Sequence, residues 1–218
     1  MQSLSTITNT IVSNKILPLF YHDDPAKCIR LVDVLYNSGI RCIEFTNRGK
    51  NSLNNFKEII QYRNNNLKDL LIGIGTIKEV KSAEQFIHAE ADFLISPFVD
   101  KSIADIAYIN KKLWIPGCMT PTEIHLAEDL GWSIVKLFPG SILGMGFVQS
   151  IKPVFPSIHF LVTGGVDLFN MQDWYQAGAS AVGMGSSLIT SQDLDMNNYS
   201  SIEMKTRKMI KIIHSMNL

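Results

Sequence analysis

The stretch Ser133-Ile134-Val135-Lys136-Leu137-Phe138-Pro139-Gly140 places a lysine at the end of a short apolar run. The run is β-branched and too short for a helix, so it predicts a strand that is buried on both faces. A lysine that points inward from such a strand has little water to solvate its ammonium, which favours the free amine. A desolvated amine is the usual nucleophile for a Schiff base with a carbonyl substrate. A lone lysine here would more often snorkel out of the strand end or pair with a structural carboxylate, so its surroundings decide between these roles and catalysis.

Seven further runs of the same kind recur along the chain. Each is short, continuous rather than alternating, and rich in Val, Ile, Leu and Phe, as the strands of a buried parallel sheet are. Together with the run that carries Lys136, the eight segments are residues 16–20, 42–45, 71–75, 93–96, 114–118, 134–137, 159–163 and 181–185.

Longer stretches with helical periodicity lie between these runs. Residues 25–37 carry Cys28, Ile29, Val32 and Leu35 on one face and begin with a proline, which suits a first helical turn. The first 13 residues also have apolar residues at helical spacing and predict an N-terminal helix. The other predicted helices are residues 52–62, 78–88, 101–110, 121–130 and 202–216. Glycines at 39 and 131 stand where C-terminal helix caps belong.

The alternation of strands and helices indicates βαβ units. Eight such units within one domain's length most economically close into an α/β fold of the TIM type, a (β/α)₈ barrel with an N-terminal helix. A doubly wound open sheet is the alternative. No linker rich in Pro, Gly or Ser divides the chain, so residues 1–218 are expected to form a single domain. The polar segment 190–201 is expected to join the last strand to the final helix, and the asparagines at 64–66 to form a surface loop.

Composition narrows the classes of partner. The 218 residues are 46% hydrophobic and 18% charged, as in a globular protein, and 20 basic residues balance 20 acidic ones. Nucleic acids and membrane surfaces attract a basic excess, so neither is an expected partner. The three cysteines lack CxxC spacing and the N-terminus lacks a signal-peptide pattern, so a reducing cytoplasm is expected. The five histidines show no metal-ligand spacing, so neither a metal nor a cofactor is expected.

Polar residues gather where the predicted strands end, which is where barrels of this kind build their active sites. Glu44 is costly inside a buried strand unless it is paired or functional, and Arg48 follows with a planar fork that suits a carboxylate. Taken alone, Glu44 could belong to a structural ion pair and Arg48 to an exposed loop. Together with an amine, they make a catalytic set. The other strand-end residues, in chain order, are Thr76, Ser96, Pro97, Thr120, Lys136, Thr163, Gly164, Gly165, Gly185 and Ser186.

Two turns that contain glycine follow the last two predicted strands. They are Thr163-Gly164-Gly165 and Gly185-Ser186. Phosphate sites in these barrels commonly lie after strands seven and eight, where glycines let backbone N–H groups approach an anion. Each could also be a tight turn without a ligand, but as a pair at these strands they favour a phosphate site. The hydroxyl of Ser186 would add a donor.

The same residues carry a resemblance to a known family. The motifs occur in the family's order: Ile43-Glu44-Phe45-Thr46-Asn47-Arg48, Ile72-Gly73-Ile74-Gly75-Thr76, Ile95-Ser96-Pro97, Ile115-Pro116-Gly117, Val135-Lys136-Leu137-Phe138-Pro139, Thr163-Gly164-Gly165 and Gly185-Ser186. The chain resembles the 2-keto-3-deoxy-6-phosphogluconate (KDPG) and 4-hydroxy-2-oxoglutarate (KHG) aldolases, class I lyases on a short (β/α)₈ barrel. The resemblance covers nearly the whole chain.

The resemblance implies a role for each site residue. Lys136 would form the Schiff base, and Glu44 would act as the general acid and base. The implied substrate contacts are Arg48 and Thr76 to the pyruvate carboxylate, Pro97 and Phe138 as pocket walls, and Gly164, Gly165 and Ser186 to the phosphate, with Thr163 and Gly185 in the same turns. Family members are typically homotrimers that use no metal, so the resemblance implies a homotrimer whose partner is a small 2-keto-3-deoxy sugar acid.

Two departures from the family pattern bear on the substrate rather than the chemistry. Gly140-Ser141-Ile142 stands where the family often has alanine and then glutamate, and Phe98 stands where a glycine is common. Both flank the distal part of the site. The expected reaction is cleavage of KDPG to pyruvate and glyceraldehyde 3-phosphate. The alternative substrates are KHG and 2-keto-3-deoxy-6-phosphogalactonate, the epimer of KDPG. The alternative function is that of a barrel that binds a phosphate ligand and has no lyase activity.

Overall fold

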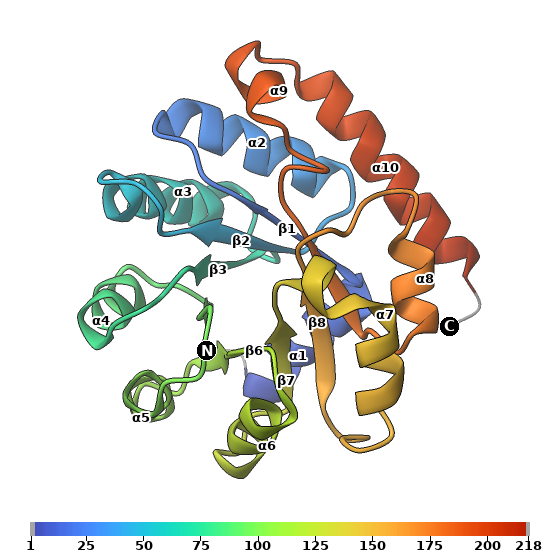
Figure 1. Cartoon of the computed structure of the whole chain (residues 1–218). Coiled ribbons are helices and arrows are strands. Elements are labelled where there is room, and N and C mark those ends of the chain that lie inside the picture. The colour runs from blue at the N-terminus through green and yellow to red at the C-terminus, as the bar shows by residue number, and fades with distance from the viewer. Residues whose placement is uncertain (1–2, 217–218) are drawn as a thin grey trace.

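Nine parallel strands alternate with helices around a barrel in the computed structural model, which describes residues 3–216 (Figure 1). The strands are β1 (Ile16–Phe20), β2 (Cys42–Thr46), β3 (Leu71–Gly75), β4 (Phe93–Ile95), β5 (Leu113–Ile115), β6 (Gly117–Cys118), β7 (Ile134–Leu137), β8 (His159–Thr163) and β9 (Ala181–Met184). The helices are α1 (Leu4–Asn14), α2 (Pro25–Asn37), α3 (Ser52–Asn66), α4 (Val80–His88), α5 (Lys101–Ile109), α6 (Pro121–Asp129), α7 (Gly140–Ile151), α8 (Met171–Gln176), α9 (Ser191–Asp195) and α10 (Tyr199–Ser215).

The fifth predicted strand is split, and the split lies where the sheet closes. Pro116 has no N–H to donate to a ladder, and it separates β5 from β6. The first of these short strands pairs with β4 and the second with β7, so the strand order runs β5-β4-β3-β2-β1-β9-β8-β7-β6. One continuous segment therefore joins the two ends of the sheet into a nearly closed barrel. The predicted (β/α)₈ barrel with an N-terminal helix is confirmed, and the open doubly wound sheet is excluded.

The structure contains three helices that the sequence does not predict, α7, α8 and α9. The polar segment 190–201 holds α9 and the start of α10, because the hydroxyl of Thr190 accepts a hydrogen bond from the Asp193 N–H and begins a helical turn. The prediction of a loop at 64–66 is wrong, because these asparagines form the last turn of α3. Gly39 and Gly131 follow helix ends at φ +105° and +85°, as predicted. No helix among residues 3–216 is long and apolar enough to cross a membrane.

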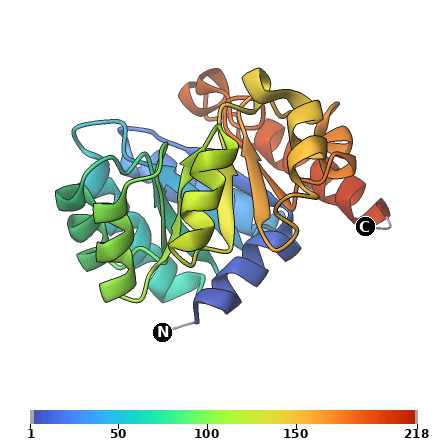
Figure 2. The same ribbon diagram turned by 60° about the horizontal axis from the view of Figure 1, so that its bottom comes forward.

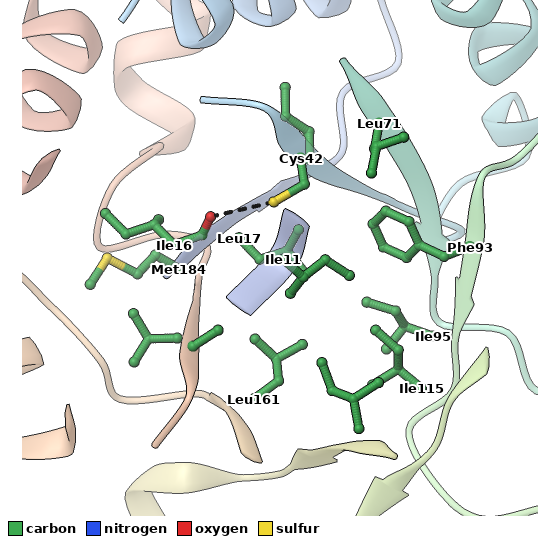
Figure 3. Packing of buried hydrophobic residues seen from close by; sticks show 14 of the residues in the cluster. Ile11, Ile16, Leu17, Cys42, Leu71, Phe93, Ile95, Ile115, Leu161 and Met184 are labelled. Atoms are coloured by element: carbon green, nitrogen blue, oxygen red, sulfur yellow. Dashed lines mark hydrogen bonds between the residues drawn. The ribbon is translucent and has the colours of Figure 1, made fainter. Parts of the chain in front are cut away.

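The barrel is filled by its own side chains and closed at one end by α1. Ile7 and Ile11 of α1 are buried, and the helix contacts β1, β2, β5 and β9. Figure 3 shows Ile11 among buried side chains from the strands, including Phe93 and Ile115. Since α1 leads directly into β1, it covers the amino-terminal ends of the strands; in Figure 2 it lies opposite α9 and the start of α7. The carboxyl ends stay available for a site.

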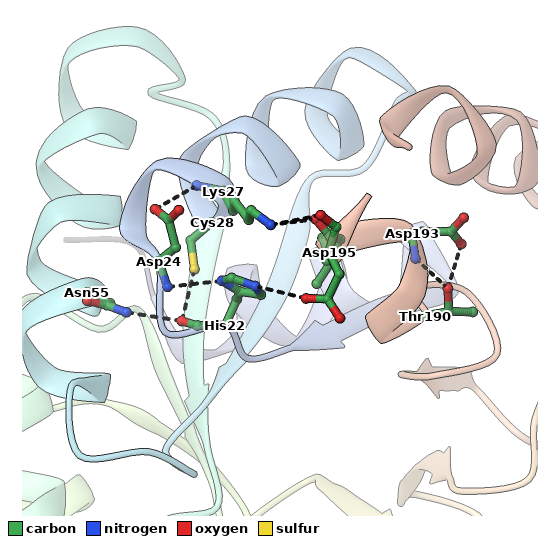
Figure 4. Close-up of polar contacts among 9 residues, drawn as sticks. His22, Asp24, Lys27, Cys28, Asn55, Thr190, Asp193 and Asp195 are labelled. Atoms are coloured by element: carbon green, nitrogen blue, oxygen red, sulfur yellow. Dashed lines mark hydrogen bonds and ion pairs between the residues drawn. The ribbon is translucent and has the colours of Figure 1, made fainter. Parts of the chain in front are cut away.

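Polar contacts fix the β1–α2 loop and the first turn of α2 to α9 on the carboxyl side (Figure 4). The ammonium of Lys27 donates to the carbonyl oxygens of Leu194 and Asp195, at 3.0 and 3.2 Å. Nε2 of His22 lies 3.8 Å from the Asp195 carboxylate, and Nδ2 of Asn55 donates to the His22 carbonyl at 3.0 Å. These contacts join α2, α3 and α9 and hold in place the segment that follows the Gly185-Ser186 turn.

Candidate active site

Lys136 of β7 and Glu44 of β2 face each other inside the barrel. Nζ of Lys136 lies 3.6 Å from Oε1 of Glu44, and the two side chains are 9% and 1% exposed. Both carboxylate oxygens of Glu44 are buried and have no hydrogen-bond partner among residues 3–216. A structural ion pair at this depth would need further hydrogen bonds to offset desolvation. A carboxylate with unused acceptor capacity beside an amine is instead suited to exchanging protons with a reactant.

Glycines on neighbouring strands make room for the polar side chains of the site. A Cβ on Gly75 of β3 would overlap Oε1 of Glu44, and a Cβ on Gly183 of β9 would overlap Oγ1 of Thr163. The hydroxyl of Thr163 is buried and, like the Glu44 carboxylate, has no partner in the described chain. Any side chain at either glycine would displace a polar group from the barrel interior.

Thr76 follows Gly75 and has a left-handed backbone conformation, with φ +62°. This conformation is unfavourable for a β-branched residue, and such strain persists mostly where the surroundings impose it, often at functional sites. Thr76 is half-buried. Its predecessor abuts the Glu44 carboxylate, so Thr76 lies at the rim beside that group.

Phe138 lies beside the amine of Lys136, and Pro97 packs on the strand next to it. The ring centroid of Phe138 is 5.4 Å from Nζ, a distance at which a cation is attracted to an aromatic face. The backbone of Pro97 packs on Gly117, where a Cβ would overlap its carbonyl group. Gly117 is paired with Lys136 across β6 and β7. Of the two residues that the resemblance implies as pocket walls, Phe138 therefore contacts the predicted nucleophile, and Pro97 reaches its strand through Gly117.

A cavity of about 330 Å³ opens at the carboxyl ends of the strands. It brings together most of the predicted substrate-binding residues: Arg48, Phe138, Thr163, Gly164, Gly165, Gly185 and Ser186. Gly164 and Gly165 have φ +95° and +78°, a region that side chains disfavour. The cavity does not include Thr76, Pro97, Lys136 or Glu44 in its lining. Phe138 lines the cavity and also contacts the amine of Lys136. The buried amine therefore lies next to the open cavity.

The cavity also contains residues that the sequence analysis missed: Leu19, Val166, Asp167, Gly183 and Ser187. The Asp167 carboxylate accepts hydrogen bonds from the N–H groups of Phe169 and Asn170, at 2.8 and 3.0 Å, and shapes the turn before α8. An aspartate two residues after a glycine pair was the available signal for this turn. The hydroxyl of Ser187 donates to the Val166 carbonyl at 2.7 Å and ties the two glycine turns together.

Two polar strand-end residues have structural roles instead. The hydroxyl of Ser96 accepts a hydrogen bond from Nε1 of Trp114 at 2.8 Å, in the core. Thr120 caps α6: its Oγ1 accepts from the N–H of Glu123, and the Glu123 carboxylate accepts from the N–H of Thr120. The Thr-x-x-Glu pattern of a capping box was visible in the sequence. Neither residue lines the cavity.

The cysteines are not candidates for the nucleophile. Burial raises the pKa of the Cys42 thiol to about 12, and it raises the pKa of Cys28 and of Cys118 to about 12 as well. All three are therefore neutral thiols near pH 7, and the thiolate is the reactive form. Among residues 3–216, no group of three or more His, Cys, Asp or Glu side chains is arranged to hold a metal ion.

Comparison with known proteins agrees with this geometry. Residues 7–205 match the family model described as KDPG and KHG aldolase. A 2-dehydro-3-deoxy-phosphogluconate aldolase of Treponema pallidum is 26% identical over 209 residues, 95% of this chain and 98% of the relative. An enzyme of the same name from Haemophilus influenzae is 29% identical, over 91% of this chain and 92% of its own. The solved structure of a 4-hydroxy-2-oxoglutarate/2-dehydro-3-deoxyphosphogluconate aldolase superposes with a TM-score of 0.83 at 28% identity, covering 98% of this chain and 99% of its own.

Proposed function

This chain belongs to the KDPG and KHG aldolase family, and from that premise we propose that it cleaves KDPG to pyruvate and glyceraldehyde 3-phosphate. The reaction would run through a Schiff base on Lys136. The observation that carries the proposal is the pairing of this buried amine with the Glu44 carboxylate at 3.6 Å. An amine supplies the nucleophile, and a carboxylate within reach supplies the proton transfers that imine chemistry needs.

The proposed mechanism begins when the neutral amine of Lys136 adds to the C2 ketone. Loss of water from the carbinolamine leaves a protonated imine, which acts as an electron sink beside the bond to be broken. Glu44 takes the proton of the C4 hydroxyl, the C3–C4 bond breaks, and the aldehyde leaves. The electron pair of that bond becomes part of an enamine. Protonation at C3 and hydrolysis then release pyruvate and return the free amine.

Arg48 and Thr76 are proposed to hold the carboxylate of the pyruvyl portion. Arg48 is exposed at the cavity wall, and its side chain makes no hydrogen bond or ion pair within residues 3–216. A guanidinium that is free in this way can form a bidentate pair with a carboxylate. Holding the carboxylate would fix C2 against Nζ, which is the main entropic contribution such contacts make to the rate.

The distal phosphate is proposed to lie against Gly164, Gly165 and Ser186. These residues share one cavity with Arg48 and Phe138, which places the two ends of a single substrate within reach of each other. Backbone N–H groups in glycine turns and a serine hydroxyl are ordinary phosphate donors. KHG and the phosphogalactonate epimer remain alternatives, because Phe98 and Gly140 depart from the family pattern near this end. Asp167 in the lining also disfavours a dianion there.

Pyruvate release tests the proposal. The purified protein is mixed with KDPG, and pyruvate is followed with lactate dehydrogenase and NADH. We expect a higher kcat/KM for KDPG than for KHG or the phosphogalactonate epimer. Lys136→Ala should keep the fold by circular dichroism and release no pyruvate. A wild-type protein that releases no pyruvate from any of the three acids would support the barrel without lyase activity.

We also propose a single-domain chain that assembles as a homotrimer in the cytoplasm. Exposed apolar side chains on adjacent helices, Tyr108 and Ile109 of α5 and Leu126 of α6, support assembly because they would be buried by a neighbouring subunit. Light scattering should give three times the 24.4 kDa chain mass. A mass equal to one chain at all concentrations would contradict the trimer.

A further inference from the structure

A second cavity lies at the amino-terminal ends of the strands, away from Lys136. Its volume is about 230 Å³. The residues that line this basal cavity are Ile7, Arg63, Lys68, Leu71, Asp92, Lys111 and Lys112. Leu71 begins β3, Asp92 precedes β4 and Lys112 precedes β5, so the basal cavity is on the face that α1 covers. None of these residues belongs to the proposed active site.

The basal cavity has an excess of positive charge. Four of its lining residues are cationic and only Asp92 is acidic. Two nearby carboxylates do not line the cavity. Asp69 pairs with Nε of Arg41 at 2.9 Å, and Glu90 accepts a hydrogen bond from Asn64 at 2.9 Å but keeps its negative charge near Lys112. The local excess therefore stands out in a chain whose basic and acidic residues balance overall.

Part of this positive charge is buried. Arg63 is 8% exposed; its Nη1 donates to Asp92 at 2.7 Å, and its Nε is buried without an acceptor in the described chain. The ammonium of Lys112 donates to the Ala91 carbonyl at 2.7 Å, and desolvation lowers its pKa. Asp92 also accepts from the Ile72 N–H, so its charge is shared. Cations in such surroundings are stabilised by a further anion.

We propose that the basal cavity binds a small oxyanion, a phosphate group that is either free or part of a phosphomonoester. Arg63 and Lys112 form its inner wall, and the exposed Lys68 and Lys111 form its entrance. A purely structural Arg63–Asp92 pair accounts for the order at the start of β3 and β4. It does not account for two further lysines that converge on the same cavity.

Lysine acylation read by peptide mass spectrometry tests this site residue by residue, independently of any aldolase activity. The wild-type protein is acetylated with an N-hydroxysuccinimide ester in sodium phosphate and in sodium chloride of equal ionic strength. At phosphate near twice its Kd, Lys68 and Lys111 should react about threefold more slowly, because two thirds of the sites are filled. Lys208 and Lys211 are exposed on α10 and should react at the same rate in both salts. Repeating the titration with glycerol 2-phosphate shows whether free phosphate or an ester binds more tightly.

Matched double variants complete the test. In a Ser186→Ala background, which weakens the proposed active-site contact, Lys68→Gln with Lys111→Gln should raise the calorimetric Kd for phosphate at least about tenfold, equivalent to about 1.4 kcal/mol. Lys208→Gln with Lys211→Gln removes the same charge and should leave this Kd unchanged. Equal acylation of Lys68 and Lys111 in the two salts, or equal phosphate affinity of the two double variants, would overturn the proposal.

Discussion

Glu44 is the carboxylate of the proposed site, and its surroundings do little to stabilise a negative charge. It is 1% exposed, its carboxylate oxygens have no hydrogen-bond partner in residues 3–216, and its nearest cation is the amine of Lys136. A group held in this way contributes little to stability, because desolvation offsets most of the attraction between the charges. Proton transfer explains its place better than folding does.

Replacing Glu44 with glutamine separates these roles. Glu44→Gln keeps the shape but cannot accept a proton, so kcat for cleavage should fall by about 10² to 10⁴, the usual contribution of general acid–base catalysis. The melting temperature should change little. Steady-state kinetics with KDPG and thermal unfolding measure the two effects. A variant that turns over as fast as wild type would make the carboxylate merely structural.

Gly75 offers a test that removes no polar group from the site but changes the position of one. In Gly75→Ala the new methyl group would overlap Oε1 of Glu44, so the carboxylate must move away from Lys136. We expect kcat to fall by at least about tenfold and the stability by about 1–3 kcal/mol through overpacking. Gly146→Ala is the matched control, because nothing lies within 4 Å of the added methyl. Full activity of Gly75→Ala would show that the position of Glu44 is not critical.

At the scale of elements, α9 is held by one carboxylate that connects three segments. Asp193 accepts from the hydroxyl of Thr190 and the ammonium of Lys205, both at 2.8 Å, and from Nδ2 of Asn198 at 3.1 Å. Lys205 belongs to α10, so this carboxylate fixes the short helix to the long one. Ionised Asp193 therefore holds α9 in place together with the contacts of Lys27 and His22.

Asp193→Asn should destabilise the protein at neutral pH by about 1–3 kcal/mol. The hydrogen bond from Lys205 holds the pKa of Asp193 below its ordinary value. The stabilisation is thus complete above the pKa of an unfolded aspartate, about 3.9, and it is lost as the pH falls through the lower folded value. The difference between variant and wild type in urea unfolding should disappear in acid. The exposed Asp173→Asn is the control, and a difference independent of pH would contradict the linkage.

The two glycine turns form the element that should select the substrate. If Ser186 donates to a phosphate, KDPG should have a kcat/KM at least about tenfold above that of its unphosphorylated analogue, since hydrogen bonds to charged groups contribute about 1.5–3 kcal/mol. Ser186→Ala should reduce this preference and leave the unphosphorylated acid unaffected. Equal values of kcat/KM for the two acids would show that the glycine turns do not bind a phosphate, and would favour KHG as the substrate.

At the scale of the whole molecule, the barrel was predictable because its strands are continuous apolar runs and its long helices have an apolar face. The split at Pro116 followed from proline chemistry, but only the pairing of β5 and β6 shows that it lies at the closure. The five-residue α9 depends on caps rather than periodicity, so its polar sequence resembled a loop. The kinked α7 includes Gly144 at φ +74°, which obscures a helical pattern.

The candidate site was predictable where its chemistry is visible in single residues, such as an amine or a carboxylate in an apolar strand. The sequence does not show which side chains lie next to one another in the folded barrel. Gly75 must be a glycine because Glu44, on another strand, occupies the space beside it. Asp167 shares its cavity with Arg48, and in the basal cavity Lys68 lies with Lys111. Each of these pairs is far apart in the sequence. Thr120 shows that a polar residue at a strand end can instead be a helix cap.

Borohydride trapping tests the central claim most directly. The protein is incubated with pyruvate and sodium borohydride, digested, and searched by mass spectrometry for a reduced pyruvyl adduct. We predict one adduct per chain, located on Lys136 and absent from Lys136→Ala. An adduct on a different lysine, or none under conditions that trap a known class I aldolase, would contradict the Schiff-base mechanism.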